Sequence, residues 1–161
     1  HAIDNQTPYL FFPCGGGQRM FESTIALANM TRTTLAINEL KKNNLPYIVV
    51  ISNPTSGGLS ASIVSTSDIC IGEGGPNGGA TYAFAGRRIV EATTKSELPS
   101  DFQTVSWQMS KGQCDMVLNR KDIMPTIGKL LSILLKKNKR ENIEEKDSLI
   151  KEVTFENKEA S

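Results

Sequence analysis

Three consecutive glycines, Gly15 to Gly17, are the residues of this chain with the clearest chemical potential. They follow the apolar run Tyr9 to Phe12 and precede a stretch with helical periodicity. Glycine lets the backbone approach a ligand closely, and the first turn of a helix leaves amide N–H groups without partners inside the helix. Such donors attract an anion or a carbonyl oxygen that gains negative charge. Taken alone, a glycine turn is more often structural, so this segment fits either an anion site or a tight turn.

A second glycine pair, Gly57 and Gly58, follows the β-branched run at 47–51 and precedes a short helix predicted over 59–66. The order strand, glycine turn, helix therefore occurs twice. Successive units of this kind predict a parallel α/β arrangement, in which the turns lie along one edge of the sheet. Two such turns favour the convergence of amide donors on one pocket.

Three other residues could suggest a nucleophile or a base, and each has a simpler interpretation. His1 is the only histidine and stands at the first position, where a disordered end is favoured. Cys14 has no further histidine to activate it, which favours a packed thiol. Ser60 resembles a strand-to-helix nucleophile, but the lack of a suitable histidine makes a serine hydrolase a poor fit.

The composition limits the class of protein. The 161 residues suffice for one domain or for a piece of a larger one, and the 18 Lys and Arg residues nearly balance the 17 Asp and Glu residues. No nucleic acid or anionic membrane is therefore expected as the main partner. The longest apolar runs are too short for a transmembrane segment. The cysteines, Cys14, Cys70 and Cys114, form no CxxC pair and predict reduced thiols rather than a disulfide framework or a zinc site.

Periodicity predicts the order of the elements. Strands are expected at 7–12, 47–51, 68–71 and within 111–118, and helices at 20–42, 59–66, 87–92, 102–109 and 123–137. The glycine-rich stretch 72–79 is expected to form an exposed loop or hairpin. Residues 136–161 are mostly Lys, Glu and Asn, which predicts a frayed helix or a disordered tail.

Several segments resemble, in order, the motifs of one enzyme family. Residues 16–22, G-G-Q-R-M-F-E, resemble the G-G-A-R-M-Q-E motif of the carboxyltransferase β subunit of bacterial and plastid multisubunit acetyl-CoA carboxylase. Residues 54–62 resemble that family's P-T-x-G-G-V-[ST]-A-S, and residues 84–91 are similar to its F-A-G-x-R-V-I-E. With further matches at 98–99 and 111–117, the resemblance covers roughly residues 7–135.

The resemblance implies an α/β fold of the crotonase-like (ClpP/crotonase) type, a spiral of ββα units, of which residues 1–135 form the C-terminal part. It also implies a half-reaction in which carboxybiotin on a carrier protein gives its carboxyl group to the coenzyme A thioester acetyl-CoA, yielding malonyl-CoA for fatty acid synthesis. By the same resemblance, the amides of Gly16 and Gly17 form the oxyanion hole. The residues implied for substrate binding are Gly57, Gly58, Arg19 and Arg87.

Three departures from the family pattern stand out. Gln18 replaces the small residue after the glycine pair, and the loop at 74–79 is longer than the family's usual link. The family's N-terminal half, which carries a four-cysteine zinc ribbon, is absent, so another polypeptide is expected to complete the domain. The implied partners are this N-terminal β-subunit polypeptide, the carboxyltransferase α subunit, biotin carboxyl carrier protein and biotin carboxylase.

The frequent Lys, Asn and Ile residues favour a plastid (chloroplast stroma) over the bacterial cytoplasm. Three alternatives stay open at this point. The first is the carboxyltransferase of a related biotin-dependent acyl-CoA carboxylase, and the second is a structural subunit of the same complex without catalysis. A serine peptidase of the related spiral fold ranks last, since it would depend on Ser60.

Overall fold

The computed structural model describes residues 1–135. The chain divides into two units, the first spanning His1–Met124, and every strand lies in this first unit. The tail predicted over 136–161 lies outside the described residues. Within the described part, no helix has both the length and the apolar character needed to cross a bilayer.

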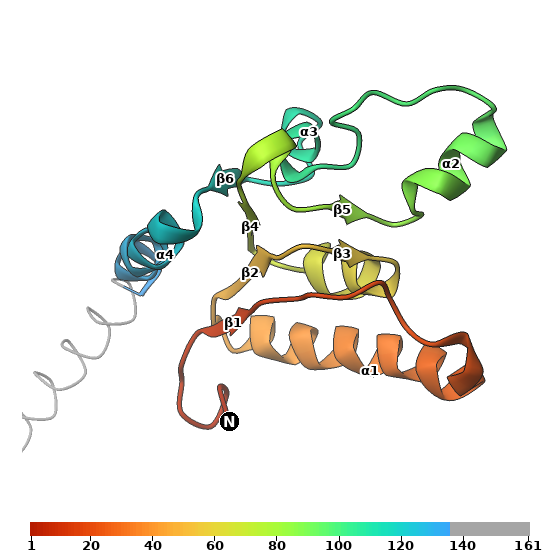
Figure 1. Cartoon of the computed structure of the whole chain (residues 1–161). Helices are drawn as coiled ribbons and strands as arrows, with labels where there is room; N and C mark the ends of the chain where they lie inside the picture. Colours follow the sequence, from red (N-terminus) through yellow and green to blue (C-terminus); the bar gives the residue numbers. More distant parts are fainter. Residues whose placement is uncertain (136–161) are drawn as a thin grey trace, which may run out of the picture. The chain divides into compact units, whose positions relative to one another are not determined.

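A four-stranded parallel sheet, in the order β1-β2-β4-β6, organises the first unit (Figure 1). The strand β2 is fully buried, because its β-branched residues lie between neighbouring strands. Leu10 pairs with Ile48 across one interface of β2, and Val50 pairs with Ile71 across the other. The predicted parallel α/β arrangement is confirmed. Its strands are β1 (Tyr9–Phe11), β2 (Tyr47–Ile51), β4 (Ile69–Glu73) and β6 (Met116–Leu118).

The helix α1 (Ser23–Lys42) runs alongside the sheet and buries Ala26, Ile37 and Leu40. A 3₁₀ turn at Met20–Glu22 precedes it, so the helix predicted from residue 20 is confirmed apart from its first turn. The core cluster on this side of the sheet joins α1 to β2 and to the helical turn at Ser60–Val64. Its members include Ile37, Leu40, Leu45, Tyr47, Val49, Ile51 and Val64.

A second, two-stranded parallel sheet was not predicted. It pairs β3 (Thr55–Ser56) with β5 (Tyr82–Ala83). Thr55 is fully buried, and its hydroxyl lies 2.9 Å from the Pro13 carbonyl oxygen and 2.8 Å from that of Ser52. The hydroxyl therefore ties this small sheet to the segment that follows β1. The helix predicted over 59–66 is a short π-helical turn at Ser60–Val64.

The remaining elements are α2 (Arg87–Thr94), α3 (Val105–Ser110) and α4 (Arg120–Leu134). The helix α3 begins later than the predicted residue 102, because Gln103 has a positive φ of 66° and Thr104 caps the helix. The Trp107 amide donates to the Thr104 hydroxyl at 3.2 Å. The strand β4 continues to Glu73, two residues beyond its prediction. A Cβ on Gly72 would lie 2.5 Å from the Cβ of Val105, so this position admits only glycine.

Candidate functional site

The two glycine turns meet in the structure. A Cβ built on Gly17 would lie 3.4 Å from the Gly57 Cα, and one built on Gly57 would lie 3.2 Å from the Gly17 Cα. Both residues also have positive φ angles, 104° for Gly17 and 64° for Gly57. The backbone conformation therefore disfavours a side chain at either position, and at Gly57 the close approach of Gly17 adds to this. Segments forty residues apart in the chain thus form one backbone surface.

Backbone hydrogen bonds hold the two turns together. The Gly15 amide donates to the Pro54 carbonyl at 2.7 Å, and the Ser56 amide donates back to the Gly15 carbonyl at 3.0 Å. The Gly57 amide donates to the Ala83 carbonyl at 3.2 Å, which fixes the second turn to β5. These bonds occupy the amides of Gly15 and Gly57. The donors available to a ligand must therefore come from the neighbouring residues.

The amides of Gly16 and Gly17 donate to no acceptor in the described part of the chain, and both residues are exposed. A helical turn begins at Gly58, whose amide also has no acceptor among residues 1–135. An N–H in the first turn of a helix lacks an intrahelical partner by geometry. The Gly58 nitrogen lies 3.6 Å from the position that a Cβ on Gly17 would take, so the two sets of donors are adjacent. Such a surface suits a carbonyl oxygen that gains negative charge.

Ser60 has a structural role beside the turns. Its hydroxyl oxygen lies 2.7 Å from the Gly57 carbonyl oxygen and 2.7 Å from that of Ala83. Both neighbours are acceptors, so the hydroxyl proton is engaged and no base faces it. The interpretation that Ser60 is not a nucleophile fits this placement. Burial raises the pKa of the nearby Tyr82 phenol to about 12, so this group stays neutral at physiological pH.

The two arginines named from the sequence differ in their surroundings. Arg19 is exposed, and its guanidinium forms no ion pair or hydrogen bond within residues 1–135. Arg87 donates from Nε to a Glu91 carboxylate oxygen at 2.9 Å, from Nη1 to the Pro99 carbonyl at 2.7 Å, and from Nη2 to the Leu98 carbonyl. These bonds hold the segment after α2 in place. Substrate binding by Arg87 stays a prediction.

Cys14 is exposed, so the expectation of a packed thiol is wrong. The residue follows β1 at the carboxyl end of the sheet, where its thiol lies 3.4 Å from the Asn53 carbonyl oxygen. It lines a polar cavity of about 520 Å³ together with Glu73 and Arg120, which form an ion pair at 2.7 Å. Sequence reasoning missed this cavity, because its walls come from the ends of four different strands, β1, β2, β4 and β6.

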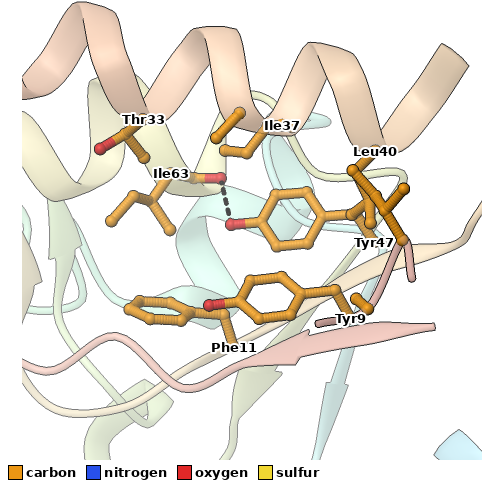
Figure 2. Close-up of a pocket in the computed structure, with 10 residues that line it drawn as sticks. Tyr9, Phe11, Thr33, Ile37, Leu40, Tyr47 and Ile63 are labelled. Atoms are coloured by element: carbon orange, nitrogen blue, oxygen red, sulfur yellow. Dashed lines mark hydrogen bonds between the residues drawn. The ribbon is translucent and has the colours of Figure 1, made fainter. Parts of the chain in front are cut away.

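A second cavity, of about 280 Å³, lies between β1 and α1 and is almost entirely apolar. Figure 2 shows Tyr9 and Phe11 of β1 on one side and Ile37 and Leu40 of α1 on the other. The Tyr47 ring also lines this cavity, and its hydroxyl donates to the Ile63 carbonyl at 3.2 Å. Burial raises the pKa of Tyr47, so its phenol remains neutral and cannot serve as a base. We refer to this space as the β1–α1 cavity.

Within residues 1–135, no group of three or more His, Cys, Asp or Glu side chains could hold a metal ion. The arrangement at the turns offers the backbone donors of Gly16, Gly17 and Gly58. Its chemical capability is to stabilise negative charge on an oxygen atom without supplying a titratable acid or base.

Comparison with known proteins identifies the class. No protein-family model matches the chain. The fold is similar to the crystal structure of transcarboxylase 12S, described as a hexamer with methylmalonyl-coenzyme A and methylmalonic acid bound. The TM-score is 0.69 at 27% identity, over 81% of this chain and 25% of that chain. A second structure of the same enzyme, with hydrolysed methylmalonyl-coenzyme A, gives a TM-score of 0.67. The chain is thus an α/β protein with the crotonase-like fold of a carboxyltransferase.

Curated relatives give the particular family, acetyl-coenzyme A carboxylase carboxyl transferase subunit beta. The protein of this name from Pelagibacter ubique is 51% identical over 92% of this chain and 47% of its own length. Those from Sinorhizobium medicae and Agrobacterium fabrum are 44% and 42% identical, each over 84% of this chain. Over the residues that it spans, the chain belongs to this family. It spans about half the length of these relatives, and all three are bacterial.

Proposed function

We propose that this chain forms part of the carboxyltransferase of acetyl-CoA carboxylase and acts in the transfer of a carboxyl group to acetyl-CoA, with malonyl-CoA as the product. The observation that carries the proposal is the contact between the two glycine turns, which groups the amides of Gly16, Gly17 and Gly58 without acceptors of their own. The names of the relatives and the likeness to transcarboxylase 12S support this choice of reaction.

The chemistry needs what these amides offer. Transfer of the carboxyl group would leave a ureido nitrogen of biotin with a free electron pair, and this nitrogen would accept the proton that the methyl group of acetyl-CoA loses. The electron pair of the broken C–H bond is shared with the thioester oxygen, which becomes negatively charged. Fixed N–H donors at Gly16, Gly17 and Gly58 stabilise this oxygen without reorganising during the reaction. Carboxybiotin on the carrier protein supplies the activated carboxyl group. Its ureido carbonyl has the same hydrogen-bonding requirement, so this uncharged donor set fits either oxygen.

The other site residues shape and orient the substrate. Without a side chain at Gly57, the second turn can lie against Gly17, and the absence of one at Gly58 leaves its amide accessible. Arg19 follows Gly16 and Gly17 in the chain, and its exposed guanidinium suits a phosphate group of coenzyme A. Arg87 is the least favoured of the proposed contacts, because its guanidinium already has three intramolecular acceptors.

The open edge of β1 suits a partner polypeptide. The strand pairs only with β2 in the described part of the chain. The Tyr9 amide donates to the Pro46 carbonyl at 2.9 Å, so alternation along the strand directs the N–H and C=O of Leu10 away from β2. The β1–α1 cavity lies beside this edge, and Tyr9 is 41% exposed there. An unpaired strand next to apolar surface is a template for strand addition.

The occupant that we infer for this edge is a polypeptide carrying the part of the relatives' length that this chain does not span. These relatives are about twice as long as the match. A strand added from that polypeptide would pair with the open edge of β1, and one of its apolar side chains would fill the β1–α1 cavity. The zinc ribbon, if present, would belong to that polypeptide. The α subunit, the biotin carboxyl carrier protein and biotin carboxylase would complete the complex. We favour a bacterial cytoplasm, since the compared relatives give the plastid no support.

Reconstitution tests the function. The chain is co-expressed with the part of the Pelagibacter ubique β subunit outside the match, and the other carboxylase subunits of that bacterium are added. We expect malonyl-CoA to form from acetyl-CoA only when this chain is present. An unchanged rate without the chain would support a structural subunit. Faster carboxylation of propionyl-CoA than of acetyl-CoA would instead support a related acyl-CoA carboxylase.

A further inference from the structure

Gln18 occupies a position between the two glycine turns that the sequence pattern alone does not explain. It directly follows Gly17, and its Cγ lies 3.9 Å from the position that a Cβ on Gly58 would take. The side chain therefore crosses from the first turn to the second. The carboxamide begins one bond beyond Cγ, so its oxygen and nitrogen are within two bonds of an atom that lies over the second turn.

The Gln18 carboxamide has no hydrogen-bond partner in the part of the chain that the structure describes, and the residue is exposed. Two other polar side chains near the turns are engaged, although the exposed Arg19 guanidinium is not. The Ser60 hydroxyl contacts two carbonyl oxygens, and the Asn53 side-chain oxygen accepts from the Thr81 amide at 3.1 Å. A glutamine side chain carries two N–H donors and an acceptor. Gln18 thus carries unengaged donors on a side chain that reaches from the first turn toward Gly58.

We propose that Gln18 is a substrate-contacting residue whose side-chain N–H donates to the same carbonyl oxygen as the Gly16 and Gly17 amides. This inference rests on the proposed function, since it concerns the same site. The residue type suits the role: a carboxamide is neutral at every working pH, so it adds a donor without adding a titratable group. Its contribution is largest when the oxygen carries the most charge, which is in the transition state.

The competing explanation is that Gln18 merely fills space over Gly58, and two variants separate the two roles. Gln18→Met keeps the length of the side chain and removes its donors, whereas Gln18→Ala removes both. A donor that acts in the transition state predicts that both variants lower kcat roughly tenfold with little change in KM. Gln18→Glu, which replaces the donor by an anion, is expected to lower kcat further. If Gln18→Met retains kcat within about twofold of the parent, the donor role is wrong.

Gln113→Met is the matched control, because Gln113 is an exposed glutamine in the turn before β6 and its side chain forms no hydrogen bond in the described part of the chain. This variant is expected to keep the parent kcat. A second measurement does not depend on turnover: the side-chain amide resonance of Gln18 in the reconstituted complex, followed as acetyl-CoA is added. A shift confined to Gln18, with Gln113 unmoved, is expected. No shift at Gln18 overturns this inference even if carboxyl transfer is observed, whereas a shift without transfer would count only against the proposed function.

Discussion

The glycine turns and the β1–α1 cavity differ in polarity: the turns present backbone N–H donors, and the cavity presents apolar side chains. At the turns, Gly16 and Gly17 are exposed, and the atoms nearest to a Cβ position built on Gly17, apart from its own chain neighbours, are backbone atoms. At the cavity, Tyr9 and Phe11 expose aromatic surface, and the polar atom nearest its back, the Tyr47 hydroxyl, is already bonded to the Ile63 carbonyl. In the described part of the chain, the glycine turns have N–H donors without acceptors, and the β1–α1 cavity has apolar surface that no other segment fills.

The difference indicates two kinds of ligand. Free donors on a fixed backbone select a small group with a charged or strongly polar oxygen. An apolar cavity beside an unpaired strand selects a polypeptide, because only another strand can satisfy the edge and fill the cavity together. We therefore propose a catalytic role for the turns and a role in assembly for the cavity. A substitution in one region should leave the function of the other unchanged.

The largest expected effect comes from Gly17→Ala. The positive φ of 104° is strained for a residue with a side chain, and the new methyl group would contact Gly57, so we expect the first turn to shift and move its amides. Displacing an oxyanion donor typically lowers kcat about 10²-fold. Steady-state malonyl-CoA formation by the reconstituted complex measures the loss.

Gly112→Ala is the matched control for the strain of that substitution. Gly112 also has a positive φ, 76°, but a Cβ there would meet nothing within 4 Å. Both variants are expected to lose roughly 1–2 kcal/mol of stability from the left-handed conformation. Only Gly17→Ala should lose activity. Equal losses of kcat in the two variants would show that strain, rather than the donors, explains the result.

A smaller effect, on assembly, is expected from Phe11→Asp. The carboxylate would stand in the wall of the β1–α1 cavity, where docking of an apolar side chain would desolvate it. We expect the affinity for the unmatched part of the Pelagibacter ubique relative to fall at least tenfold, or about 1.4 kcal/mol. Titration calorimetry measures it. Ile89→Asp on α2, where Ile89 is 62% exposed and outside the cavity, is the control and should bind as the parent does. Identical affinities for the two variants would place the partner elsewhere.

The long elements could be predicted from the sequence because their signals are local. The strand β2 was found from five consecutive apolar residues, and α1 from apolar residues at helical spacing without a proline or glycine. The small sheet could not be found, since β3 and β5 are two residues each and are defined only by their pairing. The late start of α3 was missed because nothing in the sequence marks Gln103 for a positive φ.

In the candidate site, too, features with a local sequence signal were predicted, and features that depend on distant segments were not. The glycines and their order identified both turns, but no spacing rule states that Gly17 and Gly57 touch. The partners of Arg87 and the exposure of Cys14 depend on chain segments folded from elsewhere, so residue type alone misjudged the thiol. The free donors of Gln18 were visible in the sequence only as a departure from a family motif. The position of its Cγ near Gly58 led to the inference that Gln18 contacts the substrate.

The central claim is that the amides of Gly16, Gly17 and Gly58 form one site. Isotope-labelled glycine in the reconstituted complex allows each backbone amide to be followed by nuclear magnetic resonance as acetyl-CoA is added. We predict that these three resonances shift together along one binding curve, while those of Gly86 and Gly112, which lie outside the two glycine turns, stay unmoved. Independent curves for Gly17 and Gly58, or no shift at either, would contradict the claim.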